Sequence, residues 1–346
     1  MKAITVPDLT LRPETCVAQV RTGARLHLGF LDLAGDYGRR FGSLGLAIDG
    51  FETCVRLRFA DADRAEGAER DRTLALLRRL RDLHGLGGDL HGLGGGLHGL
   101  GGGLHGLGGG LAAEVVAAIP AHAGLGSGTQ LALALARAFR KLHSLGVDTR
   151  ADAAALTRGA RSGVGVALFD RGGFVLDGGR GATTDVPSPL AHLSFPRDWR
   201  VVLLRDDSAA GAYGATERAA FAKLPPFPAA AAADICRRVL MQVLPGVAEA
   251  DFRAFGEGIT AIQARLGDHF ATAQGGGRFT SARVSEVAAV LAEAGAIGLG
   301  QSSWGPTGFV FARDPDEAAH WAQFARSAGE VSVAIHSSRE TGAEIV

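Results

Sequence analysis

The chain has few cysteines, few lysines and no excess of either charge. Its three cysteines, Cys16, Cys54 and Cys236, lie far apart and form no C-x-x-C pair. This scarcity argues against a disulfide framework and against a zinc site, and it favours a reducing cytoplasmic compartment. The 36 basic residues balance 36 acidic ones, so composition gives no case for a nucleic-acid or membrane-surface partner.

Long apolar runs are absent as well. No uninterrupted apolar stretch reaches the length of a membrane span, and the first fourteen residues hold no apolar segment of the signal-peptide type. A chain of 346 residues with 47% hydrophobic and 21% charged residues has enough material for two domains. We expect a cytoplasmic protein with domains at residues 1–185 and 195–346, separated by a proline-containing stretch.

A repeat interrupts the first expected domain. Residues 84–111 read HGLGGDL once and HGLGGGL three times, and their leucines alternate spacings of three and four, as in a coiled-coil seam. Against a helix, 15 of these 28 residues are glycine, and each costs about 1 kcal/mol relative to alanine in a helix interior. We therefore expect a weakly ordered loop insert. Its histidines lack the carboxylate or cysteine partners of a metal site.

Strands precede and follow this insert. Residues 41–48 and 52–59 show the alternation of two β-strands, and residues 71–83 have the leucine spacing of a helix. Residues 114–119 are β-branched and apolar and end at Pro120, as a strand does.

A glycine-rich loop at residues 120–130 joins that strand to an apolar helix that begins near Ser127. The first N–H groups of a helix have no intrahelical acceptor and carry the positive end of the macrodipole, so such an end binds anions, phosphate above all. Gln130 is grouped with this loop as a contact to ribose or an aromatic ring, with a plain helix-surface residue as the alternative. The residues assigned to phosphate binding are Gly124, Gly126, Ser127, Gly128, Thr129 and Gln130.

Two other polar segments complete a candidate site. Arg25 and His27 alternate with leucines and point to one face of a strand. There Arg25 can clamp a phosphate or a carboxylate and His27 can donate to a forming oxyanion; an exposed pair on a half-buried strand is the alternative. In the late segment 300–308, an aromatic substrate pocket is assigned to Gln301, Ser302, Ser303 and Trp304. Trp304 would stack on the substrate ring, and a place in the core is its alternative.

The three segments together resemble the GHMP kinase superfamily, whose second motif reads P-x-x-x-G-L-G-S-S-x-A and stands here as PAHAGLGSGTQ, residues 120–130. The resemblance implies a two-domain α+β fold, with an N-terminal ribosomal S5 domain 2-like half and a C-terminal ferredoxin-like half. It also exposes a difference, because kinases of this superfamily often carry S-G-x-D and Gly165 stands here at the aspartate position. Asp170, five residues on, is the candidate to replace that aspartate as a catalytic residue.

With this difference from the kinases, the chain resembles a non-kinase branch of the superfamily, the β-ribofuranosylaminobenzene 5′-phosphate synthases of methanopterin biosynthesis. The strings that carry this similarity are RLHLG at 25–29, GLGSGTQ at 124–130, GGFVLDGG at 172–179 and GQSSWGPT at 300–307. The resemblance implies that phosphoribosyl diphosphate condenses with 4-aminobenzoate, or 4-hydroxybenzoate in some relatives, with release of CO2 and diphosphate. It also implies Mg²⁺, for which Asp32 and Asp170 are the candidate ligands.

Two alternatives stay open, an ATP-dependent small-molecule kinase of the same fold and a non-catalytic ligand-binding homologue. The sequence leaves open whether the protein forms a homodimer.

Overall fold

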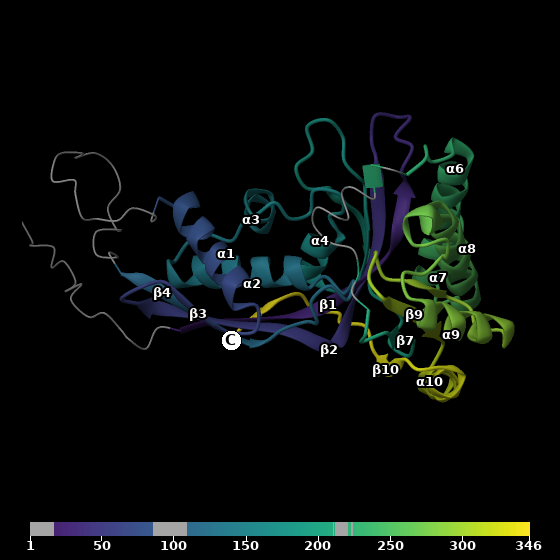
Figure 1. The fold of residues 1–346 in the computed structure, drawn as a ribbon. Coiled ribbons are helices and arrows are strands. Elements are labelled where there is room, and N and C mark those ends of the chain that lie inside the picture. Colours follow the sequence, from purple (N-terminus) through teal and green to yellow (C-terminus); the bar gives the residue numbers. More distant parts are fainter. Residues whose placement is uncertain (1–16, 86–108, 210, 212–220, 223) are drawn as a thin grey trace, which may run out of the picture.

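A computed structural model describes residues 17–85, 109–209, 211, 221–222 and 224–346 (Figure 1). The expected loop insert falls mostly on residues 86–108, and that part of the prediction lies outside the described residues. None of the helices in the described residues is both long and apolar enough to cross a membrane. The described elements, in chain order, are β1 (Val17–Asp32), β2 (Phe41–Ala60), β3 (Arg64–Gly67), α1 (Arg70–Leu83), β4 (Gly110–Ala117), α2 (Ser127–Leu142), α3 (Thr149–Ala155), α4 (Val164–Arg171), β5 (Phe174–Asp177), β6 (Pro189–Leu193), β7 (Arg200–Arg205), α6 (Ala229–Arg238), the π-helical η1 (Val239–Val243), α7 (Leu244–Ala248), α8 (Phe252–Phe270), the 3₁₀-helical η2 (Ala271–Ala273), α9 (Ala282–Glu293), β8 (Leu299–Gln301), β9 (Thr307–Ala312), α10 (Pro315–Ala328), β10 (Ser332–His336) and β11 (Glu344–Ile345).

A long antiparallel pair, β1 and β2, forms the spine of the first half. Its seven-stranded sheet has the order β11-β1-β2-β4-β3, with β5 and β6 added beside β2. Helices α1 to α4 lie along one face of this sheet (Figure 1). Strands β3 and β4 are parallel neighbours, so α1 and the residues after it form the crossover between them.

Helix α2 is the centre of that half. Most of its residues after the first turn are buried, and they pack on β1 and β2 while α1, α3 and α4 cover them. A helix that is apolar on most sides belongs inside a fold. Its N-terminus, which carries the glycine-rich loop, is thereby fixed against the sheet.

The second half is an antiparallel sheet with helices on both faces. Its strand order is β10-β7-β9-β8, with helices between β7 and β8 and α10 between β9 and β10. This is the β-α-β-β-α-β arrangement of ferredoxin-like folds. Val202, Leu204 and Val310 pack on the face of α9 and α10. The predicted α+β fold is confirmed.

One hydrophobic core extends through both halves. It joins Leu26, Leu28 and Leu44 of the first sheet to Ile262 and Phe309 of the second half, all essentially buried. The polar segments at the end of β1 and at the start of α2 therefore lie next to β8 and β9, which positions the candidate site.

Candidate active site

The structure brings the three polar segments of the sequence together. The N–H of His27 donates to the Ser302 hydroxyl at 3.1 Å, and that hydroxyl donates to the Gly124 carbonyl at 2.7 Å. Arg25 Nη1 donates to the same carbonyl at 2.7 Å. Ser302 is fully buried, so its hydroxyl joins β1, the glycine-rich loop and the loop after β8.

Glycine is required in this loop because of close approach and backbone conformation. Gly124 and Gly126 have φ values of +78° and +85°, which disfavour other residues. A Cβ on Gly124 would lie 2.3 Å from the Ser302 carbonyl oxygen, and one on Gly126 would lie 2.8 Å from Cγ of Arg25. The tight loop ends at Ser127, the first residue of α2, whose leading N–H groups have no acceptor within the helix. Such an arrangement is suited to bind an anion.

Arg25 and His27 face this anion site and its neighbouring cavity from β1. The register between β1 and β2 shifts at His27, which is a β-bulge, and such bulges re-aim side chains. His27 is 4% exposed, and its Nε2 has no hydrogen-bond partner among the described residues. Burial, and then the charges of Arg25 and Arg161, lower the pKa of His27 to about 3. The imidazole is therefore neutral at ordinary pH.

A cavity lies beside His27. Its lining includes Phe30, Phe221, Arg278, Ser303 and Trp304. Trp304 stacks on Phe221 with ring centroids 4.7 Å apart, and its buried Nε1 has no hydrogen-bond partner in the described part of the chain. Two buried polar atoms without partners in an aromatic cavity favour a ligand that has both a ring and polar substituents.

The other residues assigned to the substrate pocket divide into two kinds. Gln301 and Ser303 line the cavity, and the Gln301 amide donates to Gln274 Oε1 at 2.9 Å and to the Ser303 carbonyl at 3.0 Å. Ser303 has a φ of +59°, an uncommon conformation that clusters at functional sites. The Ser302 hydroxyl, in contrast, makes the hydrogen bonds that join the three segments.

Gln130 was predicted to contact a ligand from the glycine-rich loop, and the structure shows it bonded inside the protein instead. It is 1% exposed; its Oε1 accepts from the Thr22 hydroxyl at 2.6 Å, and its Nε2 donates to the Gly165 carbonyl at 3.0 Å. Both ends of the amide are used inside the protein, so neither a phosphate contact nor a helix-surface position describes it. Gln130 instead fixes the start of α2 against β1 and α4.

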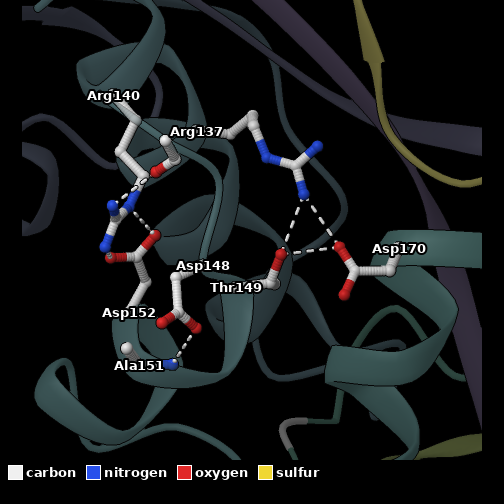
Figure 2. A network of polar contacts seen from close by, with 8 residues as sticks. Arg137, Arg140, Asp148, Thr149, Ala151, Asp152 and Asp170 are labelled. Carbon is white, nitrogen blue, oxygen red and sulfur yellow. Dashed lines mark hydrogen bonds and ion pairs between the residues drawn. The ribbon is translucent and has the colours of Figure 1, made fainter. Parts of the chain in front are cut away.

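Asp170 contacts Arg137 and Thr149 instead of the loop, and Figure 2 shows these contacts. Its Oδ1 accepts from Arg137 Nη2 at 2.8 Å and from the Thr149 hydroxyl at 2.6 Å. Arg137 lies ten residues beyond Ser127, about 15 Å along α2. The expectation that Asp170 replaces the kinase aspartate is therefore wrong in its geometry.

The two carboxylates predicted as metal ligands do not form a site. Asp32 Oδ1 accepts from the N–H groups of Ala34 and Gly35 in a turn, whereas Asp170 pairs with Arg137. In the described ranges, no group of three or more His, Cys, Asp or Glu side chains could hold a metal ion. The residues predicted for Mg²⁺ do not fit it.

Several site residues gave no signal in the sequence. Gln263 of α8 donates to the Leu28 carbonyl at 2.8 Å and accepts from the Gln301 N–H at 2.9 Å, so it bridges β1 and β8. The Arg161 guanidinium lies 4.7 Å from the Phe221 ring centroid. Neither residue belongs to a local motif, and only the tertiary fold brings them to the site.

Comparisons with known proteins define the class first. Residues 98–176 match the GHMP kinases N terminal domain, and residues 243–331 match GHMP kinases C terminal. The structure is similar to homoserine kinase from Cytophaga hutchinsonii, with a TM-score of 0.64 and 18% identity over 98% of this chain and 100% of that chain. The protein has the GHMP kinase fold.

Sequence relatives define the family within that class. Beta-ribofuranosylphenol 5′-phosphate synthase from Archaeoglobus fulgidus is 34% identical over 261 residues, which cover 71% of this chain and 75% of the relative. The protein of the same name from Methanothermobacter thermautotrophicus is 29% identical over 307 residues, 83% of this chain and 86% of the relative. The chain belongs to the beta-ribofuranosylphenol 5′-phosphate synthase family, which confirms the resemblance found in the sequence.

Proposed function

We propose that the protein joins phosphoribosyl diphosphate to a para-substituted benzoate and forms a β-ribofuranosyl-arene 5′-phosphate, with release of CO2 and diphosphate. The observation that carries the proposal is the aromatic cavity at His27 and Trp304, directly beside an anion-binding loop. The relatives' names describe a phenol product, so 4-hydroxybenzoate is the first arene to test and 4-aminobenzoate the second.

The two substrates would lie on either side of Ser302. The diphosphate would contact the loop and the first N–H groups of α2, with the positive charge of Arg25 beside Gly126. The arene would occupy the cavity, where the buried polar atoms of His27 and Trp304 have no hydrogen-bond partner among the described residues. Because the Gly124 carbonyl accepts from both Arg25 and Ser302, the loop and the cavity are held in a fixed relation, which the reaction geometry needs.

The bonds balance without a proton-abstracting base. The C1–O bond of the ribose breaks, and its electron pair leaves with diphosphate. The ring carbon that carries the carboxylate attacks C1, and the new C–C bond takes a pair from the ring. The C–CO2 bond then breaks, and its pair restores aromaticity. The largest contribution of the enzyme would be electrostatic stabilisation of the leaving diphosphate.

The site departs from the kinase pattern at Gly165. A Cβ on Gly165 would lie 3.4 Å from Thr129 Cγ2 and 4.0 Å from Arg25 Nε. Gly165 therefore faces the site at the position where the kinase pattern has aspartate, and it carries no carboxylate. A reaction that expels CO2 rather than a proton suits this position.

Mg²⁺ remains a proposal taken from the family resemblance. Asp32 accepts hydrogen bonds within a turn and Asp170 pairs with Arg137, so we derive no step through a metal ion.

Product analysis tests this function. Purified protein is incubated with phosphoribosyl diphosphate and each benzoate, and in parallel with ATP and candidate alcohols, with Mg²⁺ in all reactions. We expect a ribofuranosyl-arene phosphate by mass spectrometry and an equal amount of diphosphate. ATP-dependent phosphorylation of an alcohol, with no arene product, would establish the kinase alternative, and neither reaction in folded protein would favour the ligand-binding alternative.

A further inference from the structure

An arginine side chain from α1 lies against the first turn of α2. A Cβ built on Gly128 would lie 2.1 Å from Nη2 of Arg72, so the guanidinium occupies the space that a side chain at position 128 would need. Arg72 belongs to the first turn of α1, far from the loop in sequence. Gly128 stands where the motif P-x-x-x-G-L-G-S-S-x-A has its second serine. In this chain, a guanidinium takes the place of that serine side chain.

The surroundings of Arg72 are strongly cationic. Its ion-pair partner in the described residues is Glu69, and the Nη1–Oε2 distance of 3.4 Å is long for a charge-assisted hydrogen bond. Arg158 has a buried Nε without a hydrogen-bond partner among the described residues. Burial, and then the charges of Arg72 and Arg79, lower the pKa of Arg158. Cations at a helix N-terminus are unfavourable, so a bound anion would stabilise this cluster.

We infer that Arg72 binds the diphosphate of phosphoribosyl diphosphate against the N-terminus of α2. The identity of this anion rests on the proposed function, whereas its place rests on the contact of Arg72 with Gly128. A guanidinium donates two parallel hydrogen bonds to phosphate oxygens. On this side of the loop, Arg72 would stabilise the charge that grows on diphosphate as the C1–O bond breaks.

The contact with Gly128 makes the inference specific. A methyl group at position 128 would displace the guanidinium, so Gly128→Ala and Arg72→Ala should weaken the same interaction. If Gly128→Ala acts through Arg72, it should have little effect once Arg72 is already alanine. This is the expected pattern of a double-mutant cycle for two contacting residues. Arg78, exposed on the same helix, supplies a matched control.

Calorimetric titration with inorganic diphosphate measures the affinity of wild type, Arg72→Ala, Gly128→Ala, the double variant and Arg78→Ala. We expect the Kd to rise at least about 10-fold in each of the first two variants, since a hydrogen bond to a charged group is lost. The double variant should match Arg72→Ala, and Arg78→Ala should stay within about 2-fold of wild type. Thermal unfolding of each variant checks its fold, to which the partly exposed Arg72–Glu69 ion pair contributes little.

The outcomes separate this inference from the proposed function. The inference is overturned if folded Arg72→Ala binds diphosphate with unchanged affinity, or if the losses in the double variant are additive. In either case, arene product from wild type would still support the proposed function. Product formation by a wild type without measurable diphosphate affinity also overturns the inference. Wild type that binds no diphosphate and makes no product refutes both.

Discussion

His27 is a titratable side chain that the fold removes from water. It is buried between cationic neighbours, and its Nε2 meets no partner among the described residues. A neutral imidazole in this place can exchange hydrogen bonds with a substrate without adding charge to the cavity. The low pKa of His27 therefore follows from the same burial and charges that form the site, and it makes the free energy of unfolding depend on pH.

The unfolding free energy should depend on pH through His27. Its pKa is about 3 in the folded chain against an ordinary value of 6.5, so between these values the unfolded chain binds the proton and stability falls as the pH falls. Between pH 7 and pH 5, this group should cost wild type about 2 kcal/mol that His27→Gln does not lose. Denaturant titrations of both proteins at the two pH values measure the difference. Equal losses would show that His27 is not held neutral.

Trp304 should distinguish the two substrates. Trp304→Phe keeps a ring against Phe221 but removes the buried Nε1 donor. We expect KM for the arene to rise about 5-fold to 10-fold, as for one lost hydrogen bond, and KM for phosphoribosyl diphosphate to change less than about 2-fold. Initial rates with each substrate varied in turn measure both constants. Equal changes in the two would remove Trp304 from arene binding.

The loop before α2 acts as a unit whose shape depends on glycine. Gly126→Ala adds a Cβ that meets Arg25 and disfavours the left-handed backbone. We expect diphosphate affinity to fall at least about 10-fold by calorimetry. Gly146→Ala is the control, because a Cβ at Gly146 meets no atom within 4 Å. The same loss in both variants would contradict a specific role for this loop.

The elements that the sequence predicted well are those set by local patterns. The glycine-rich loop and α2 follow from three glycines before an apolar run, and the phase of Arg25 and His27 follows from alternation with leucines. Residues 41–48 and 52–59, expected as two strands, form the single strand β2, because pairing with β1 continues past the register shift at Gly23. Leu111, assigned to the insert, lies buried in β4. Pairing across the sheet decided both outcomes.

The residues that the sequence could not place depend on distant partners. Asp170 pairs with Arg137 and Thr149 instead of contacting the loop, and these partners are separated from it by 33 and 21 positions in the sequence. Gln263 and Arg72 reach the site from α8 and α1, and no local motif marks either of them. Gly128 was assigned to phosphate binding, but only the structure shows that Arg72 fills the space beside it.

At the scale of the whole molecule, the described part of the site is built from both halves of the chain. Helix α1 ends at Leu83 and β4 begins at Gly110, and His84 stacks on Phe139 with ring centroids 5.2 Å apart. Replacing residues 86–108 with a glycine-serine segment of equal length should keep product formation within about 2-fold, since the loop closure is unchanged. The rate of product formation and the Tm of both proteins test this. Loss of activity in a folded variant would assign the insert a catalytic role.

The most direct test of the central claim follows the carboxyl carbon of the arene. Wild type is given phosphoribosyl diphosphate and 4-hydroxybenzoate or 4-aminobenzoate labelled in the carboxyl group, and released CO2 and diphosphate are counted. The account predicts labelled CO2 in a 1:1 ratio with diphosphate, and none when phosphoribosyl diphosphate is omitted. Diphosphate release without labelled CO2, or product that retains the label, would contradict it.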